Sequence, residues 1–576
     1  MTASHGNPHP VFFHNDIIGA VIDYIAQVHR HDLYYCWLPK DFRPLVNAAA
    51  VCQSWRRLAL PLVFKSMIIE VERVAVEHGS GQVSRPVHRE KCLSNVEFLP
   101  PGCESLAKDL VLSFGADVIS GNAARYLEEI GVSGRSWPEI KLLSIHISAA
   151  ELEEVDDLDD FDEHGDPRPL YSAEHVMQLA SYALKLVPNV TNALIQLDSR
   201  PSGGIDLEEG FGQRLQDIKM LTICESVIYH NRTLVVPQLT YLDINCTQLE
   251  SVRWLAGASA ATLKVLLLTG ITRDLFYSSF FDVPESTSMV FSDLRVLVVY
   301  MASQMDDPHT PPSSPVSVPM FSFPRLKTLL LSTRACRSDT SWEMVPWFAD
   351  SPLHEVYLMG ATRFAQQFDF ARYPDLRTFD ALLADLTEQD SVELSARLMS
   401  SKSGIRELAL RTARGGIPIS LDIGSTNIHD LYLTTELTAA KLRSIVAQLP
   451  RLVFLGCNPP SEKSDDSDAI LGAEAVAMQI PAHDFSPIHS RLQEIKLHDL
   501  NWQGSMRYGM SRQFVDLAAT FACIPSLLKV RIGVDFIDGG VFIRRLLTEM
   551  LATDATPHMR ELSVIFGKII ETLFDH

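Results

Sequence analysis

A short spacing of apolar residues, large-x-x-large-x-large, recurs along most of this chain. The last two apolar positions lie two residues apart, so a β-strand presents both on one face and the residue between them on the other. The clearest copies are Leu239-x-x-Leu242-x-Ile244, Leu263-x-x-Leu266-x-Leu268, Leu294-x-x-Leu297-x-Val299, Leu326-x-x-Leu329-x-Leu331, Leu353-x-x-Val356-x-Leu358, Ile405-x-x-Leu408-x-Leu410 and Ile428-x-x-Leu431-x-Leu433. Further copies begin at Leu492, Leu527 and Met559, at Ile140 and Ile218, and in weaker form at Leu376 and Leu452.

The residues around these copies predict what connects them. A proline stands two residues before the first apolar position at Pro237, Pro324, Pro374, Pro450 and Pro525. Proline suits this place because it ends a preceding helix and donates no hydrogen bond to a strand ladder. Helix-like stretches at 439–446 and 514–519 lie between copies. Alternating strands and helices of this kind predict a solenoid, in which each repeat stacks on its neighbours.

An ordinary α/β domain is the alternative, because its buried strands are also rich in Leu and Val. The copies are 23 to 40 residues apart, whereas regular leucine-rich repeats span roughly 20–29 residues, and the Asn or Cys that usually follows the motif is mostly missing. A doubly wound domain does not, however, repeat one hexapeptide a dozen times. We therefore predict an α+β/α/β repeat fold: an irregular leucine-rich-repeat solenoid of parallel strands alternating with helices over residues 139–576.

Three segments within that range are unlike folded core. Residues 151–169 form an acidic run, with ten carboxylates and no Lys or Arg between Glu151 and Asp166. Residues 303–319 are rich in Pro and Ser, and residues 458–468 are polar. Self-repulsion and low apolar content favour solvated loops, so we expect three excursions from the scaffold.

The first 66 residues predict a separate helical module after a flexible stretch at 1–12. Residues 15–25 carry apolar side chains at i, i+1, i+4, i+5 and i+8, which is one face of an amphipathic helix. A polar insertion at 29–42 follows, and residues 45–66 are helical in character up to Pro61. We expect residues 67–138 to be a linker and an N-terminal cap of the repeats.

The segment Val51-Cys52-x-x-Trp55-Arg56-x-Leu58-Ala59-x-Pro61-Leu62-Val63-Phe64 resembles the second half of an F-box, and the helix at 16–25 resembles the first half. With the repeats behind it, the chain resembles the fungal F-box-like proteins with leucine-rich repeats. The resemblance is sharp over the N-terminal module and only architectural beyond it. It departs from the motif in two places: Phe13-His14 stands where the motif usually opens with Leu-Pro, and the insertion lengthens the loop between the halves.

This resemblance implies a mechanism without catalysis by the chain itself. F-box proteins bind a Skp-family adaptor and through it a cullin–RING ubiquitin ligase, while their repeats hold a protein substrate at raised effective concentration. By the same resemblance, the candidates for adaptor docking are Ile17, Ile18, Val21, Ile22, Ile25, Pro61 and Leu62. Val51, Trp55 and Leu58 are expected in the module core. For any one docking candidate, a role in holding the helices together remains the alternative.

Charge and cysteine content restrict the partners. The formal net charge of −21 disfavours nucleic acids and anionic membrane surfaces, which require cationic protein surface. The nine cysteines are scattered without a C-x-x-C pair, and neither a signal peptide nor a spanning segment is recognisable. The sequence therefore predicts a soluble protein of the cytoplasm, the nucleus or both.

No constellation predicts catalysis, a cofactor or a metal site. The nucleophile-elbow, P-loop, dinucleotide and zincin motifs are missing from the sequence. His29 and His31 could form a metal pair but are better explained as surface residues. A calcium loop starting at Asp160 fails at His164 and Tyr171, where further ligands are required.

Three functions remain open at this stage: a ligase substrate receptor, an interaction scaffold that no longer binds the Skp adaptor, and an enzyme whose site the sequence does not reveal. For a substrate, the sequence offers only the class of residues between the framework leucines, such as Tyr241, Arg295, Lys327 and Tyr357, or the strand residue that follows each.

Overall fold

The protein is described by a computed structural model of the 576-residue chain. The structure describes residues 30–33, 36–39, 43–51, 53–76, 87–96, 99, 101–119, 123–129, 134–135, 137–148, 171–198, 202, 205–224, 228–229, 238–245, 259–271, 289–301, 321–333, 341–383, 388–400, 404–412, 427–436, 439–458, 491–500, 524–534, 561–566 and 569–575. The chain divides into two compact units, Met1–Pro284 and Glu285–His576, each considered by itself.

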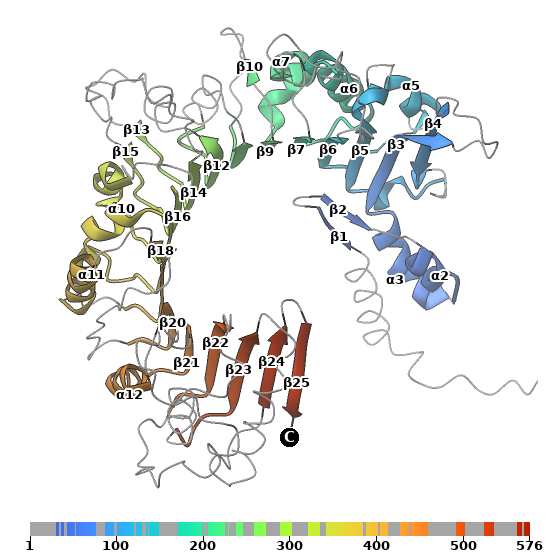
Figure 1. The fold of residues 1–576 in the computed structure, drawn as a ribbon. Coiled ribbons are helices and arrows are strands. Elements are labelled where there is room, and N and C mark those ends of the chain that lie inside the picture. Colours follow the sequence, from blue (N-terminus) through green and yellow to red (C-terminus); the bar gives the residue numbers. More distant parts are fainter. Residues whose placement is uncertain are drawn as a thin grey trace, which may run out of the picture. The chain divides into compact units, whose positions relative to one another are not determined.

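Unit 1 combines a helical N-terminal part with a long sheet (Figure 1). Its elements are β1 (Arg30–Leu33), β2 (Cys36–Pro39), α2 (Arg43–Val51), α3 (Gln53–Val63), β3 (Ser66–Val76), β4 (Val87–Ser94), η3 (Glu104–Leu106), β5 (Asp109–Gly115), α4 (Ala116–Ile119), α5 (Ala123–Glu129), β6 (Leu142–Ser148), α6 (Ala173–Leu186), β7 (Asn192–Leu197), β8 (Ile205–Asp206), α7 (Leu207–Phe211), η6 (Gly212–Asp217), β9 (Met220–Cys224), β10 (Ile228–Tyr229), β11 (Tyr241–Asn245) and β12 (Val265–Ile271). The strands pair in the order β4-β3-β5-β6-β7-β9-β11-β12, and only β3 and β4 are antiparallel. Two small sheets, antiparallel β1–β2 and parallel β8–β10, stand apart from it.

Unit 2 continues the same architecture. Its elements are β13 (Met289–Val290), β14 (Val296–Met301), β15 (Phe321–Ser322), β16 (Thr328–Ser332), η7 (Ser341–Phe348), β17 (Glu355–Met359), α10 (Thr362–Gln367), η8 (Phe370–Arg372), β18 (Thr378–Leu383), α11 (Glu388–Ser400), β19 (Glu407–Thr412), β20 (Asp430–Glu436), α12 (Ala439–Gln448), β21 (Phe454–Asn458), β22 (Glu494–Leu500), β23 (Lys529–Val534), β24 (Glu561–Phe566) and β25 (Ile569–Asp575). From β14, the strands β16 to β24 follow in chain order and in parallel, and β25 closes the row antiparallel. The short strands β13 and β15 form a separate parallel pair.

Parallel strands joined by helices, repeated in chain order, make each unit an α/β solenoid-like fold. This confirms the coarse prediction of a repeat array of parallel strands. Each predicted copy of the motif contains a strand that begins two residues after its first apolar position, as β17 does after Leu353. The sheet also includes β3 and β5, which overlap the 67–138 segment predicted as a linker and N-terminal cap. The antiparallel β4 occupies the edge beside β3.

The motif positions form the core because the strands pair in register. In unit 2 the residues at the second apolar position of the motif stack from repeat to repeat, and each is at most 1% exposed. They are Leu329, Val356, Phe379, Leu408, Leu431 and Leu455. The helices α10, α11 and α12 cover this side of the sheet (Figure 1). We call the other side, which carries no helix in the described part of unit 2, the open face.

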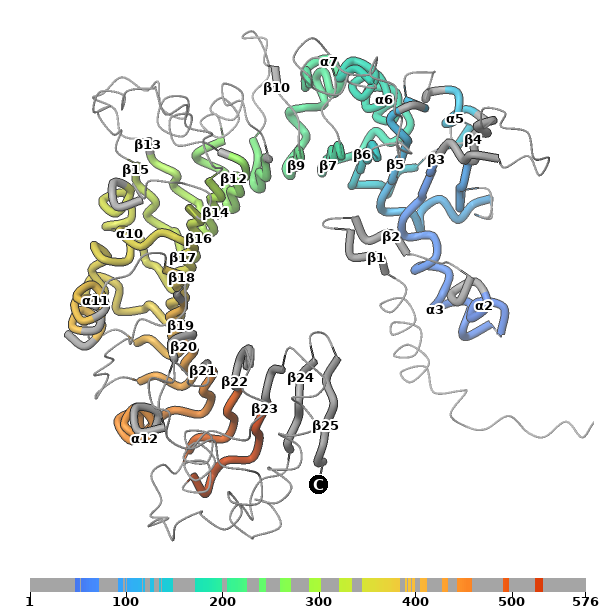
Figure 2. The backbone as a smooth tube through the Cα atoms, viewed as in Figure 1, coloured from blue at the N-terminus to red at the C-terminus, as the bar shows by residue number. Residues whose placement is uncertain are grey.

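A backbone ladder keeps the repeats aligned despite their unequal lengths. The carbonyl of Arg295 accepts from the amides of Lys327 and Thr328 at 2.9 and 3.0 Å. The carbonyl of Lys327 accepts in the same way from His354 and Glu355, at 2.7 and 3.0 Å. Because each repeat enters the sheet through these two bonds, extra residues are accommodated elsewhere in the repeat, and the path of the strands stays regular (Figure 2).

Several predicted features lie wholly or partly outside the described residues. These are the helices at 15–25 and 514–519 and the excursions at 151–169, 303–319 and 458–468. The predicted helical stretch 439–446 lies within α12. None of the described helices is long and apolar enough to cross a membrane.

Candidate functional site

Helices α2 and α3 pack through small side chains. Ala48, Ala49 and Ala59 are 6% exposed or less, and the Arg56 Nε donates to the Ala49 carbonyl at 3.2 Å. Alanines at the contact let two helix backbones approach closely, which leaves no room there for large residues. The bulky residues of the F-box-like segment consequently point elsewhere.

The three residues expected in the module core are not at this contact. Val51 is 59% exposed and Leu58 is 36% exposed, whereas Trp55 is half-buried. The indole N–H of Trp55 is shielded from solvent and finds no acceptor in the described part of the chain. The buried residues of this part of the chain are instead the alanines and Val63 of the two helices, and Phe64 directly after α3.

The docking candidates divide into two groups. Pro61 is exposed and Leu62 is half-buried on α3. With Leu58 they occupy positions i, i+3 and i+4, so the three side chains form one stripe along the helix. Ile17, Ile18, Val21, Ile22 and Ile25 lie outside the described residues. The described candidates thus fall on an apolar stripe of α3 at the protein surface, and Val51 at the end of α2 is a further exposed apolar residue.

A buried amide fixes α3 to the sheet. Asn95 is 7% exposed; its side-chain NH2 donates to the carbonyls of Ser66 at 2.8 Å and Val63 at 3.4 Å, and its side-chain oxygen accepts from the Ile68 amide at 2.8 Å. These bonds join the last residue of α3 to the first residues of β3. The apolar stripe is therefore held in a defined orientation relative to the first repeats.

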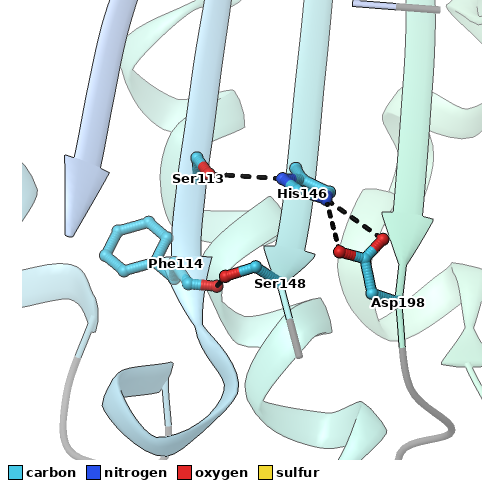
Figure 3. Close-up of polar contacts among 5 residues, drawn as sticks. All are labelled: Ser113, Phe114, His146, Ser148 and Asp198. Atoms are coloured by element: carbon cyan, nitrogen blue, oxygen red, sulfur yellow. Dashed lines mark hydrogen bonds and ion pairs between the residues drawn. The ribbon is translucent and has the colours of Figure 1, made fainter. Parts of the chain in front are cut away.

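A polar cluster lies on the sheet of unit 1, opposite the buried motif positions. His146 on β6 lies between Ser113 on β5 and Asp198, the residue after β7 (Figure 3). The Ser113 hydroxyl is 3.3 Å from His146 Nδ1, and Nε2 is 3.1 and 3.2 Å from the Asp198 carboxylate oxygens. An ionised carboxylate only accepts, so Nε2 donates to Asp198, and in the neutral ring Nδ1 accepts from Ser113.

These residue types are those of a serine hydrolase, but the surroundings favour a structural role. Ser113 is only 7% exposed. Its strand pairs in parallel with β3 on one side and β6 on the other, so the neighbouring amides are used in the ladder instead of forming an oxyanion hole. The cluster is therefore better explained as a set of hydrogen bonds that join neighbouring repeats than as a nucleophilic site. Sequence analysis missed it because its members lie 33 and 52 residues apart.

The open face of unit 2 carries a different set of side chains across β17–β21. We call Glu355, Tyr357, Asp380, Glu407, Asp430, Tyr432 and Phe454 the acidic–aromatic face. Register places Glu355, Glu407 and Asp430 in one row across the strands, and Tyr357, Asp380 and Tyr432 in a second row two residues further on. All seven are half-buried or exposed.

Hydroxyl groups orient two of these carboxylates. The Thr328 hydroxyl donates to Glu355 at 3.1 Å, and the Thr378 hydroxyl donates to Glu407 at 3.2 Å. Asp380 differs, because Arg411 Nη2 lies 2.6 Å from both of its oxygens and Nε lies 3.1 Å from one. Of the carboxylates on this face, Asp380 thus has its charge compensated within the protein.

Burial and mutual repulsion raise pKa values on this face. The pKa of Asp430 is raised above its ordinary value by burial and by the nearby Glu407. The pKa values of Tyr357 and Tyr432 are raised by burial and by the surrounding carboxylates, Glu355 for the first and Asp430 for the second. Beyond the effect of burial, the contribution of neighbouring carboxylates to each shift is that of a negative potential on this face.

The four residues predicted to face a partner are distributed over both units. Tyr357 lies on the acidic–aromatic face, and Tyr241 is half-buried with its hydroxyl 3.5 Å from Asp243. Arg295 and Lys327 are exposed, but they stand one residue before their strands, where their carbonyls serve the backbone ladder. The sequence therefore identified one residue of the acidic–aromatic face; aligning the third and fifth positions of the motif would have identified more.

Comparison with known proteins adds no relative. The chain matches no protein-family model, and no curated protein matches it. The described residues also contain no group of three or more His, Cys, Asp or Glu placed to hold a metal ion. The function must therefore be inferred from two surfaces, the apolar stripe of α3 and the open face of unit 2.

Proposed function

We propose that this chain is the substrate-recognition subunit of a Skp–cullin–F-box ubiquitin ligase. In this proposal the α2–α3 module binds a Skp-family adaptor, and the leucine-rich-repeat sheet holds a protein substrate. The chain supplies no reacting group; it raises the concentration of substrate near the ubiquitin-conjugating enzyme.

The observation that supports this proposal is the solvent exposure of the apolar residues in the F-box-like segment. A small helical pair usually buries residues such as Val51 and Leu58, yet they are 59% and 36% exposed, beside the exposed Pro61. A patch of exposed apolar side chains is typical of a protein-binding surface. The Asn95 hydrogen bonds support it further, because a substrate receptor must hold its docking module rigidly relative to its repeats.

A scaffold that does not bind the Skp adaptor is the second candidate. Two observations favour it: the sequence has Phe13-His14 in place of the usual Leu-Pro, and the insertion between the two halves contains an antiparallel hairpin, in which Arg30 pairs with Pro39 and Leu33 with Cys36. A hairpin at this point of the module would lie close to any adaptor bound there.

Co-expression of the full chain with a Skp-family adaptor from the same source tests the proposal. We expect a stable complex on affinity capture and size-exclusion chromatography. The variant Leu58→Asp with Pro61→Asp places two charges on the apolar stripe and should abolish the complex, because burying an unpaired charge is strongly unfavourable.

The matched control is Val392→Asp on α11, an apolar residue that is 43% exposed in unit 2. This variant should bind the adaptor normally. If the folded wild-type chain forms no complex, or if the double variant and the control bind equally well, the ligase proposal fails and the scaffold function replaces it.

A further inference from the structure

The acidic–aromatic face has carboxylates for which the described residues provide no Lys or Arg partner. Within the part of the chain that the structure describes, Glu355, Glu407 and Asp430 form no ion pair with Lys or Arg. The first two accept threonine hydroxyls, which orient a carboxylate without cancelling its charge. Partly desolvated like charges repel one another, so this face gains most from a cationic partner.

Aromatic rings lie among these carboxylates. Tyr357 follows Glu355 by two residues on β17, and the rings of Tyr432 and Phe454 lie 4.8 Å apart on adjacent strands. The face of an aromatic ring attracts a cation, and a guanidinium or ammonium group next to a carboxylate can use both interactions together. The rings also provide apolar area for the carbon chain of Arg or Lys.

The open-face residues on either side of β17–β21 differ from the acidic–aromatic face. Towards β14, the open-face positions Val296, Val298 and Leu330 are apolar. Beyond β21, the open face carries Lys496, Lys529 and Arg531, and Arg531 is paired with Glu494 at 3.1 Å. Among these described open-face residues of unit 2, the carboxylates without a Lys or Arg partner therefore lie on β17–β20.

The spacing suits an extended chain rather than a metal ion. No three carboxylates of the described residues are close enough to bind one metal. Adjacent strands lie about 4.8 Å apart, so the three steps from Glu355 to Asp430 cover about 14 Å, the length of roughly four or five extended residues.

We infer that the acidic–aromatic face binds an extended protein segment that carries Arg or Lys side chains. The cations lie between Glu355, Glu407 and Asp430, and their stems pack on Tyr357, Tyr432 and Phe454. The identification of this segment as a ligase substrate rests on the proposed function. Binding of the segment to the acidic–aromatic face does not depend on the adaptor.

Peptide binding to the full chain without adaptor tests the inference. The probe is a fluorescein-labelled peptide of twelve residues in which arginine and serine alternate, and the matched peptide carries neutral citrulline in place of each arginine. Fluorescence anisotropy should show binding of the arginine peptide that weakens as salt is added, and at least tenfold weaker binding of the citrulline peptide.

Because the whole chain is acidic, the decisive comparison keeps net charge constant. Glu407→Gln with Asp430→Asn removes two carboxylates of the face and should weaken binding by roughly three- to tenfold. Asp375→Asn with Glu393→Gln removes two exposed carboxylates elsewhere in unit 2 and should leave binding unchanged. Circular dichroism confirms that both variants are folded.

Three results would overturn the inference: no binding of the arginine peptide by folded wild-type chain, equal loss in both double variants, or a wild-type dimer that Glu407→Gln with Asp430→Asn disperses. The third would assign the face to a second copy of the chain. A chain that binds the peptide as expected but not the Skp-family adaptor would refute only the ligase proposal.

Discussion

The two faces of the unit 2 sheet are built from alternate residues of the same strands, yet they behave in opposite ways. On the helix-covered face the motif residues are almost fully buried, as Leu408 and Leu431 are. On the open face their neighbours Glu407 and Tyr432 stay exposed and half-buried, respectively. The repeated motif thus determines the scaffold, whereas the residues between its apolar positions are available to contact a partner.

The sharpest test of this contrast compares two neighbouring residues. Leu431→Ala leaves a cavity on the covered face and should lower the free energy of unfolding by about 2–5 kcal/mol. Tyr432→Ala, one residue further on the open face, should cost less than about 1 kcal/mol and should weaken arginine-peptide binding instead. Urea denaturation and anisotropy of both variants measure the two effects. Equal destabilisation by the two substitutions would contradict the division between the faces.

The buried side chain of Asn95 tests whether the interior of unit 1 depends on satisfied polar atoms. Asn95→Ala removes two donors and one acceptor and leaves the Ile68 amide without its side-chain partner. An unsatisfied buried polar group costs about 1–3 kcal/mol, so we expect a loss of stability in that range. We also expect faster hydrogen exchange at residues 63–68, measured by mass spectrometry. Asn192→Ala, a half-buried asparagine on β7, is the control and should change neither. Unchanged exchange at 63–68 would mean that Asn95 does not fix the module.

Tyr373 allows the contribution of a buried hydrogen bond to stability to be measured as a function of pH. Its hydroxyl donates to the Phe348 carbonyl at 3.1 Å, and burial raises the pKa of Tyr373 to about 12. Because the folded pKa lies above the ordinary value near 10, the protonated phenol stabilises the fold fully below pH 10, and this contribution is lost as pH rises through about 12. Tyr373→Phe should therefore be about 1 kcal/mol less stable than wild type at pH 9.

The difference between Tyr373→Phe and wild type should shrink between pH 10 and 12, measured by urea denaturation at each pH. Tyr357→Phe, on the open face, is the comparison at pH 9 and should lose less stability. A gap between wild type and Tyr373→Phe that is constant up to pH 12 would mean that this phenol does not titrate as a buried group.

The smallest effect concerns Asp380, the carboxylate of the acidic–aromatic face that Arg411 neutralises. Arg411→Gln releases Asp380 from its bidentate ion pair. The freed carboxylate should strengthen binding of the arginine peptide by roughly two- to fivefold, the value of an additional partly exposed ion pair. Anisotropy titration measures the change, and weaker binding would show that Arg411 supports the face instead of competing with the peptide.

Much of the scaffold could be predicted from the sequence, because burial and strand period act on every repeat in the same way. The repeats that were missed are those with an altered first position. Phe64, Ala107 and Val190 stand where the other copies have Leu or Ile, and the strands β3, β5 and β7 each begin two residues later. An Ala at this position fills the core only if its neighbours are larger, which one repeat read alone does not reveal.

The sites were harder to predict because they depend on contacts between repeats. Ser113, His146 and Asp198 meet only after three repeats stack. In the module, Val51 and Leu58 were expected in the core, but both are exposed, whereas Ala48, Ala49 and Ala59 are buried. Helix packing, and not hydrophobicity alone, decides which face of α3 is buried.

The central claim is that one chain joins an adaptor to a substrate segment, and a ternary complex tests it most directly. Full chain, Skp-family adaptor and labelled arginine peptide should elute together in size-exclusion chromatography with light scattering, at a mass equal to one copy of each. The peptide should bind with the same affinity whether or not adaptor is saturating. An adaptor that does not join the complex, or one that displaces the peptide, would contradict the account.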